Sequence, residues 1–367
     1  MKRTLKELLF LFGFIVDSVF DALPPLRKRK KYQNFDVVIV KFDALGDLFI
    51  SLSFIHDVSR NDKVLIIADE VYLDLLKVYG YQVLPVNKLK YIKNLFYRFK
   101  IRKIISKIYC DTLINLNISR PNLASDSICS GVLSRFKTGF MADRVNSDLL
   151  AELLYKNLYS RLIDGLKFQH ELEKLSAISE AIKIESVQNT QIQATSKGEY
   201  FLVALGAGQK GRSWAYENLV EVIRFVYQKY RIKCFISGSN KEVNTAKKIV
   251  KSLKASVDIE SKAGMTSVIE YVDLVKGASF VISNESSAIH IANFYHVKSF
   301  CILGGGHYGR FVPYPTDFQW VHAISYKMDC YGCNWNCKYV RIDKESPPCI
   351  NGITAHQVID KIQNILQ

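Results

Sequence analysis

From residue 36 onward, short runs of β-branched residues alternate with segments whose apolar residues recur at helical spacing. Strands that alternate with helical segments in this way are typical of βαβ units, which build a parallel sheet. The first half of the chain therefore predicts one such domain. Its expected strands are 37–40, 64–67 and 111–117, with helical segments from 47, from 71 and over 169–182.

The alternation restarts after a polar stretch at 185–198, which is the best linker in the chain. The second half predicts another α/β domain, so we expect two Rossmann-like domains whose parallel sheets face each other. The expected strands here are 200–205, 234–236, 280–282 and 300–303, with helices from 216, from 241, from 286 and over 354–366.

The length supports this division, because 367 residues exceed one ordinary core and fit two domains of ~150 residues each. Hydrophobic residues at 49% and charged residues at 23% are typical of globular chains and exclude a disordered one. The predicted parts are an N-terminal segment at 1–32, a domain at 33–185, a linker at 186–198, a domain at 199–350 that includes a cysteine-rich segment at 326–350, and a C-terminal helix at 351–367.

The formal net charge of +15 favours an anionic partner such as nucleic acid, phospholipid or a phosphorylated glycan. Residues 1–31 hold eight basic and three acidic residues, and residues 86–107 hold eight basic residues and no acid. Aromatic residues interleave the second stretch, as expected where a surface meets phosphates or lipid headgroups, although a solvated basic helix has a similar composition. The candidate contacts to an acceptor or a membrane are Lys93, Arg98, Lys100, Arg102 and Lys103.

The run at 8–20 is strongly apolar, but Asp17 interrupts it and it is shorter than the ~20 residues of a spanning helix. Basic residues flank it, and Pro24 and Pro25 follow it without a small-residue cleavage site. This pattern predicts an interfacial helix that holds the protein on the cytoplasmic face of the inner membrane. A cleaved signal peptide is the alternative.

The loops after the predicted strands carry the candidate chemistry, since ligands of doubly wound domains bind beyond the carboxyl ends of the strands. After the first strand, Gly46 allows a tight turn, and Asp47 stands at a helix start, where it can cap N–H groups or act as a base. The second domain opens with the glycine-rich loop LGAGQKGRSW at 205–214. Gly206, Lys210 and Arg212 of this loop suit a pyrophosphate, whereas a loop that merely turns the chain is the alternative.

Two later loops belong to the same edge of the second sheet. Gly238 and Glu242 follow a strand in an arrangement that suits a carboxylate bound to ribose hydroxyls. The segment SNESSAIHIA at 283–292 places small hydroxyl residues at a helix N-terminus, where phosphate oxygens meet N–H groups. A histidine within such a helix is more often packed than catalytic. The candidate donor-binding residues of this segment are Asn284, Glu285, Ser286, Ser287 and His290.

Taken together, these loops resemble glycosyltransferase family 9, and the likeness covers most of residues 36–366. The L-G-D element of the family is matched at 45–47, and its N-D-[ST]-G-x-x-H-[IL]-A element at 284–292. Glu285 stands where Asp is usual, and Ser287 where Gly is usual. Looser matches are the basic residue two places before Trp at 212–214 and the glycine and glutamate at 238 and 242.

The resemblance implies an inverting, metal-independent glycosyltransferase of the GT-B fold, similar to the lipopolysaccharide heptosyltransferases. It implies a nucleotide-sugar donor, ADP-heptose, on the C-terminal domain, and an anionic glycolipid or surface glycan as acceptor on the N-terminal domain. Asp47 is then the expected base, while Lys210, Arg212 and the helix start at Ser286 and Ser287 stabilise the leaving group. No D-x-D element stands in a plausible metal-binding loop, so no catalytic cofactor is expected.

Four of the eight cysteines stand in apolar contexts that suit buried thiols in a reducing cytoplasm. The other four form a dense cluster that could bind structural zinc or an iron–sulfur centre, form two disulfides, or stay reduced. We favour a structural staple that clamps residues 326–350. The cluster consists of Cys330, Cys333, Cys337 and Cys349.

Three other functions compete with glycosyl transfer. A nucleic-acid-binding protein fits the basic charge, but no recognisable nucleic-acid module accompanies it, and we expect no nucleic-acid partner. A non-catalytic sugar-nucleotide-binding protein fits the departures at Glu285 and Ser287. A nicotinamide-dependent dehydrogenase is weakened because the fingerprint G-x-G-x-x-G is missing.

Overall fold

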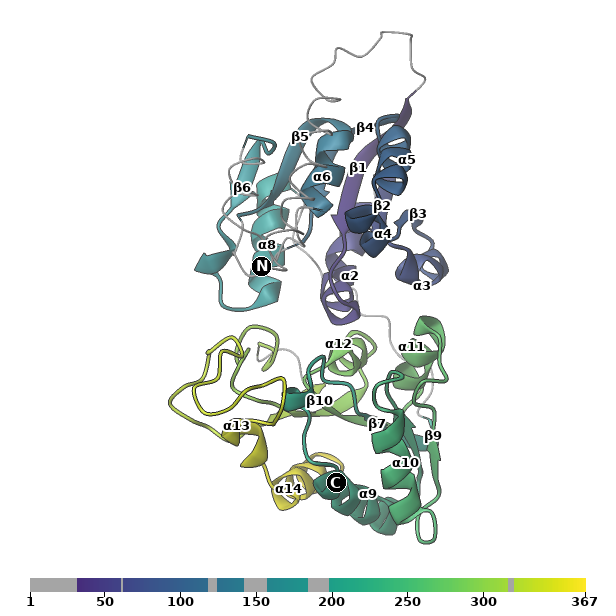
Figure 1. Cartoon of the computed structure of the whole chain (residues 1–367), viewed down its shortest axis with the longest axis vertical. Coiled ribbons are helices and arrows are strands. Elements are labelled where there is room, and N and C mark those ends of the chain that lie inside the picture. Colours follow the sequence, from purple (N-terminus) through teal and green to yellow (C-terminus); the bar gives the residue numbers. More distant parts are fainter. Residues whose placement is uncertain (1–31, 61, 118–123, 142–156, 184–197, 316–319) are drawn as a thin grey trace. The chain divides into compact units, whose positions relative to one another are not determined.

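The computed structural model describes residues 32–60, 62–117, 124–141, 157–183, 198–315 and 320–367 (Figure 1). The helix predicted at 8–20 lies outside the described residues. The chain forms two compact units, which are described separately below. The first unit comprises Met1–Asp43, Phe54–Phe168 and Lys174–Gln188, and the second comprises Ala44–Ser53, Gln169–Glu173 and Asn189–Gln367.

A six-stranded sheet in the order β3-β2-β1-β4-β5-β6 forms the centre of the first unit, and every pairing in it is parallel. The strands are β1 Gln33–Lys41, β2 Val64–Asp69, β3 Gln82–Val86, β4 Ile108–Asn115, β5 Leu133–Phe140 and β6 Arg161–Ile163. The helices in this part of the chain are α2 Leu45–Ser59, η1 Glu70–Tyr72, α3 Leu73–Val78, α4 Lys88–Lys93, α5 Leu95–Ile105, α6 Ala124–Gly131, η2 Gly165–Lys167 and α8 Glu171–Ile182.

Strand β1 lies between β2 and β4, so both of its edges are paired, and its successive residues, which point to opposite faces, are buried from Val37 to Lys41. Val38, Ile39 and Val40 are 0% exposed. A strand covered on both faces reads as a continuous apolar run, which is why its position was evident in the sequence. Helices α4, α5 and α6 contribute buried side chains to the core on one face, among them Tyr91, Ile101, Ile105 and Ile128.

The second unit has a sheet in the order β12-β11-β10-β7-β8-β9, and it too is parallel throughout. The strands are β7 Tyr200–Ala204, β8 Lys233–Ser237, β9 Ile259–Ser261, β10 Phe280–Asn284, β11 Lys298–Ile302 and β12 Val321–Ile324. The helices are η3 Lys210–Arg212, α9 Tyr216–Tyr230, α10 Val243–Leu253, α11 Val268–Lys276, α12 Ser287–Phe294, α13 Pro348–Asn351 and α14 Ala355–Ile365. Capping boxes at Ser267 and Thr354 set the starts of α11 and α14.

Both sheets reverse their strand order at one point. Numbered from its own first strand, each sheet has the order 3-2-1-4-5-6, with the reversal between β1 and β4 in the first unit and between β7 and β10 in the second. Helices that leave neighbouring strands at such a point go to opposite faces, so a crevice opens at the carboxyl ends of the two strands. The fold therefore confirms two Rossmann-type sheets and places a ligand crevice beside β7 and β10.

Two short segments that the sequence placed in the first domain pack with the second unit instead. Phe49 of α2 contacts Phe294 and Tyr295, with ring centroids 5.5 and 6.3 Å apart. Arg310 Nε lies 2.7 Å from Glu171 Oε1. The predicted boundary at 185 rests on the polar stretch and on the restart of the alternation, and neither signal reveals that segments 44–53 and 169–173 pack with residues far along the chain.

None of the helices within the described ranges is long and apolar enough to cross a lipid bilayer.

Candidate functional site

A cavity of about 560 Å³ opens in the second unit at the carboxyl ends of β7, β8 and β10. It lies beside the reversal of strand order. Nine of the residues that the sequence predicted for the site line it: Asp47, Gly206, Arg212, Gly238, Glu242, Glu285, Ser286, Ser287 and His290. The cavity therefore brings together loops that are up to about 240 residues apart in the sequence.

The glycine-rich loop after β7 forms one wall. Gly208 has φ +73°, a left-handed conformation that favours glycine, and a side chain added at Gly206 would meet no atom within 4 Å. Backbone N–H groups can therefore approach a ligand closely here. The side chain of Lys210 lies outside the described part of the structure, so its predicted role stays a prediction.

Arg212 is held between an acid and an aromatic ring. Its Nη2 donates to Glu285 Oε2 at 3.0 Å, and its Cζ lies 4.7 Å from the centroid of the Trp335 ring. Glu285 is 5% exposed, and burial raises the pKa of its carboxyl while Arg212 opposes that rise. The glutamate at this departure from the family motif is thus a buried partner of the cavity's arginine.

His290 lies in α12, and Gly46 packs directly on it: a Cβ at Gly46 would lie 2.8 Å from His290 Cδ2. Burial, helped by His170 and Arg212, lowers the pKa of His290 to about 3. Its Nδ1 lies 2.7 Å from the hydroxyl of Tyr314, which also forms a hydrogen bond with the Asn293 side chain.

The ring of His290 is therefore neutral at neutral pH, where it acts as a hydrogen-bonding group rather than as a cation. If the Asn293 amide donates to the Tyr314 oxygen, that hydroxyl donates in turn to His290 Nδ1. The remaining proton is then on Nε2, and the ring presents an N–H donor to the cavity wall.

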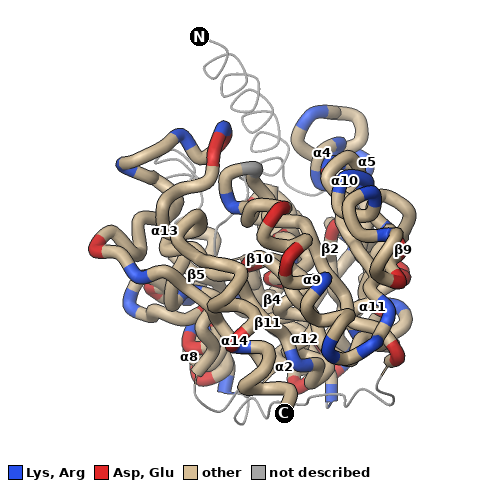
Figure 2. Tube along the Cα trace, turned by 90° about the horizontal axis from the view of Figure 1, so that it is seen from below, with Lys and Arg blue, Asp and Glu red and all other residues tan. Residues whose placement is uncertain are grey.

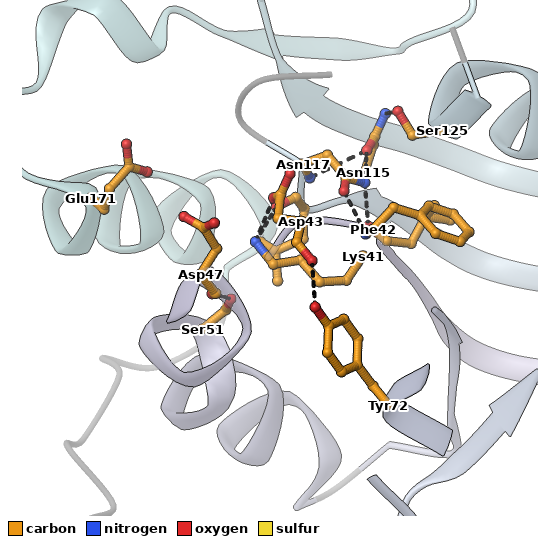
Figure 3. A network of polar contacts seen from close by, with 12 residues as sticks. Lys41, Phe42, Asp43, Asp47, Ser51, Tyr72, Asn115, Asn117, Ser125 and Glu171 are labelled. Atoms are coloured by element: carbon orange, nitrogen blue, oxygen red, sulfur yellow. Dashed lines mark hydrogen bonds and ion pairs between the residues drawn. The ribbon is translucent and has the colours of Figure 1, made fainter. Parts of the chain in front are cut away.

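Asp47 lies in the first turn of α2, and the segment that carries it lines the cavity. The hydroxyl of Ser51 donates to the Asp47 backbone carbonyl at 2.5 Å. Figure 3 shows the Asp47 side chain projecting from the start of α2, away from the helix axis.

Two predicted residues have structural contacts that explain their presence. Glu242 Oε2 accepts from the Ser239 backbone N–H at 2.8 Å and from its hydroxyl at 2.7 Å, so the carboxylate orders the loop before α10 while lining the cavity. Asn284 does not line it. Its Oδ1 accepts from the Trp214 N–H at 2.9 Å, and its Nδ2 donates to the Leu205 carbonyl at 3.2 Å. These two hydrogen bonds connect the glycine-rich loop to β10.

Sequence reasoning missed the wall that α11 supplies. Thr266, Ser267 and Tyr271 line the cavity, and the capping box that begins with Ser267 was a readable signal for this helix start. Burial raises the pKa of Tyr271 to about 12, so its hydroxyl keeps its proton. That hydroxyl lies 3.4 Å from Ser287 Oγ.

His307 is a further lining residue, in the glycine-containing loop that follows β11. Burial, with Arg212 and Arg310 nearby, lowers its pKa to about 4. Among the described residues, three buried polar atoms on this wall have no hydrogen-bond partner: Arg212 Nε, His307 Nδ1 and Ser237 Oγ. Unpaired buried polar atoms are costly, and their convergence on one cavity is typical of a ligand site.

The cysteine-rich segment packs against the same wall. Gly211 N–H donates to the Ile342 carbonyl at 2.9 Å, Ser346 Oγ to the Ser213 carbonyl at 2.7 Å, and Trp335 supplies the ring under Arg212. Cys330, Cys333, Cys337 and Cys349 line one small cavity beneath this segment.

These four thiols are not joined by disulfides in the structure. Within the described ranges, no group of three or more His, Cys, Asp or Glu side chains is arranged to hold a metal ion. The contacts above hold the segment against the cavity wall. A structural zinc stays a prediction, which metal analysis of the purified protein tests.

Helices α4 and α5 present the predicted basic surface, and Figure 2 shows Lys and Arg along both without an acidic residue. Lys93, Lys100 and Lys103 are exposed, beside Phe96 and Phe99, which are 90% and 59% exposed.

Two of the predicted surface residues face inward instead. Arg98 is 3% exposed and donates to the carbonyls of Tyr91 and Ile92, each at 3.1 Å, and Arg102 donates to the Ser127 carbonyl at 2.8 Å. Both guanidinium groups satisfy carbonyls near helix ends, a role that charge counting does not reveal.

Two parallel Rossmann-type sheets in one chain, with a glycine-rich, arginine-bearing crevice in the second, define a protein of the GT-B class. Comparison with solved structures supports this class. A glycosyl transferase family 9 protein from Veillonella parvula is 14% identical, with a TM-score of 0.71 over 90% of this chain and 97% of that one. E. coli heptosyltransferase WaaC, bound to ADP-2-deoxy-2-fluoro heptose, is 18% identical, with a TM-score of 0.66 over 90% and 99%. E. coli ADP-heptose lps heptosyltransferase II is 11% identical, with a TM-score of 0.62 over 90% and 98%.

The sequence itself matches the family model described as Glycosyltransferase family 9 (heptosyltransferase) over residues 166–336. A search of curated protein sequences found no match. The family model thus matches the part of the chain that holds most of the cavity wall, and the resemblance predicted from the loop motifs is confirmed over that part.

The buried neutral histidines predict a specific pH dependence of stability. The pKa of His290 is about 3 in the folded protein, whereas the ordinary value of 6.5 applies in the unfolded chain. Between these two pH values the unfolded chain binds a proton that the folded protein does not. The free energy of unfolding should therefore fall as the pH drops from about 7 to about 5. Thermal melts across this range should show a smaller drop in His290→Gln than in wild type.

His356→Gln is the matched control, because that side chain is 82% exposed. It should leave the pH dependence unchanged. Equal pH profiles for wild type and His290→Gln would contradict a neutral, buried His290.

Proposed function

We propose that this protein is an inverting glycosyltransferase that moves a sugar from a nucleotide donor bound in the second unit to an anionic glycolipid or surface-glycan acceptor. The observation that carries the proposal is the cavity at the reversal of strand order, where Arg212, the glycine-rich loop and the start of α12 meet. These groups offer positive charge and N–H donors, which a pyrophosphate requires.

The donor that we propose is a nucleoside diphosphate sugar, and ADP-heptose is the first candidate. Support comes from the family match over residues 166–336 and from the WaaC structure, whose ligand is an ADP-heptose analogue. Thr266, Ser267 and Glu242 line the part of the cavity near β8 and α11, where their hydroxyl and carboxylate groups suit a ribose. The phosphates would then lie toward Arg212 and Ser286.

In the proposed reaction, Asp47 takes the proton from the acceptor hydroxyl as its oxygen attacks the anomeric carbon. The bond from this carbon to the phosphate oxygen breaks on the opposite face, so the configuration inverts. The nucleoside diphosphate leaves with the bonding electron pair. Negative charge grows on the leaving oxygen, where Arg212 and the N-terminus of α12 stabilise it. These groups supply the positive charge that a metal ion would otherwise provide, so we propose metal-independent catalysis.

We also propose that the exposed face of α4 and α5 rests on an anionic bilayer, where a lipid-linked acceptor is found. This face consists of Lys90, Lys93, Lys100 and Lys103 together with Leu89, Leu95, Phe96 and Phe99, all exposed. Lysines attract anionic headgroups at about 1 kcal/mol each, and exposed aromatic rings insert at the interface. Contact through this surface would hold the protein on a bilayer without a spanning helix.

Nucleotide binding is the first test. ADP or ADP-heptose should raise the melting temperature of the wild-type protein by mass action. Arg212→Ala should lose most of this shift, because it removes a cation from the cavity wall and leaves Glu285 without its partner. Arg341→Ala is the matched control, since Arg341 pairs with Asp343 at an exposed position. Stabilisation by DNA alone would favour a nucleic-acid-binding protein instead.

Substitution of Asp47 separates catalysis from binding. Asp47→Asn keeps the size of the side chain but removes the base, and should lower the rate of transfer by roughly 10²–10⁴-fold. The nucleotide-induced melting shift should persist. Asp111→Asn, on the exposed side of β4, serves as the control for a lost carboxylate. A variant at position 47 with full transfer activity would exclude Asp47 as the base.

Vesicle binding tests the proposed surface of α4 and α5. The wild-type protein should co-sediment with phosphatidylglycerol-containing vesicles far more than with phosphatidylcholine vesicles. Substitution of both Phe96 and Phe99 by Ser should weaken binding, whereas Met265→Ser, at a position 72% exposed in the second unit, should not. Substitution of Lys100 and Lys103 by Glu should abolish the preference for anionic vesicles, and full binding in that variant would contradict the proposal.

A further inference from the structure

The loop that precedes Asp47 is anchored in an unusual way. It comprises residues 42–44, between the end of β1 at Lys41 and the start of α2 at Leu45. These residues lie beyond the sheet ladder, yet Phe42 is 2% exposed and belongs to the core of the first unit. Its backbone polar groups therefore need partners from outside the ladder.

Three side chains from three other connections supply those partners. Phe42 N–H donates to Asn117 Oδ1 at 2.6 Å, and Lys88 Nζ donates to the Phe42 carbonyl at 3.1 Å. The hydroxyl of Tyr72 donates to the Asp43 carbonyl at 3.3 Å. Asn117 follows β4, Tyr72 ends η1 after β2, and Lys88 begins α4 after β3. Each partner thus comes from the carboxyl end of a different strand.

Asn117 has a particular geometry. Its amide accepts from Phe42 N–H and donates through Nδ2 to the Val40 carbonyl at 2.9 Å. Strands β1 and β4 pair in parallel up to Val40 and Asn115, so the Asn117 side chain continues the pattern of donors and acceptors past the end of the ladder. A side-chain amide replaces one rung of a parallel sheet.

Asn117 is itself fixed by buried polar contacts. Its Nδ2 also donates to Asn115 Oδ1 at 2.8 Å, and Asn115 Nδ2 donates to the Tyr159 hydroxyl at 2.6 Å. Asn115 and Asn117 are 0% exposed. Figure 3 shows these amides converging on the segment that runs from Lys41 to the start of α2.

The charged residues of the segment are tied down as well. Lys41 Nζ donates to Asp43 Oδ2 at 2.8 Å and to the Leu116 carbonyl at 3.1 Å, and Lys41 is only 4% exposed. Asp43 therefore neutralises a buried ammonium group.

We propose that Asn117, Lys88 and Tyr72 are positioning residues that hold the loop at 42–44 and thereby fix the start of α2 and the Asp47 carboxylate. This inference rests on the proposed function, because it assigns the scaffold to the base of the transfer reaction. A base must be held within a fraction of an ångström of its working position, since a displacement near 1 Å can cost about 100-fold in rate.

The experiment compares Asn117→Leu, Lys88→Met and Tyr72→Phe with wild type. The leucine is similar in size to asparagine but has no donor or acceptor, so Phe42 N–H and the Val40 carbonyl lose their partner. We expect kcat to fall by at least about tenfold in Asn117→Leu and by a few-fold in the other two, with the KM for the nucleotide sugar unchanged. Asn117→Asp retains the acceptor for Phe42 N–H and should recover part of the rate.

Hydrogen–deuterium exchange of the full-length protein gives a second readout that needs no transfer activity. Peptides that cover residues 42–50 should exchange faster in Asn117→Leu and in the milder Lys88→Met, while peptides of the second unit's β10 should not change. If the wild type binds nucleotide but transfers no sugar, the proposed function fails, and the exchange data still decide whether these side chains order the loop. Unchanged exchange, or equal losses in kcat and in nucleotide affinity, would overturn the positioning role.

Discussion

Parallel pairing of β7 with β10 is the constraint on which the candidate site depends. The two strands are adjacent in space but separate in sequence, and the helices that follow them lie on opposite faces of the sheet. No short loop therefore connects the carboxyl ends of these two strands, and the space between them stays open. The glycine-rich loop leaves one strand, the SNESS segment leaves the other, and the space between them is the cavity.

Electrostatics within this cavity depend on burial as much as on charge. The histidines at 290 and 307 have pKa values lowered to about 3 and about 4, so both are neutral hydrogen-bonding groups at neutral pH. Trp335 and Glu285 hold the guanidinium group of Arg212 from two sides. A guanidinium fixed in this way needs little reorganisation when negative charge develops nearby, which is the condition for effective electrostatic stabilisation.

Much of the architecture was readable from local patterns. Strands β1, β2, β7, β8, β10 and β11 were located from their β-branched runs, because central parallel strands are apolar on both faces. Strands β3, β5, β6, β9 and β12 were not predicted, since strands at or near a sheet edge have weaker apolar patterns. The capping box at Ser267 was present in the sequence but was not recognised. The contribution of Ser267 to the cavity could not be predicted, because it depends on where α11 packs.

The sequence by itself determined the class of fold, the glycine-rich and hydroxyl-rich loops at the strand ends and the candidate base at Asp47, because these follow from the chemistry of neighbouring residues. Only the tertiary structure decided which charges face inward. Arg98 satisfies carbonyls at the end of α4, Glu285 pairs with Arg212 over a separation of 73 residues, and Asn117 completes the ladder beside Phe42 over 75. Such roles are set by contacts between distant segments, and a single sequence carries no local pattern for them.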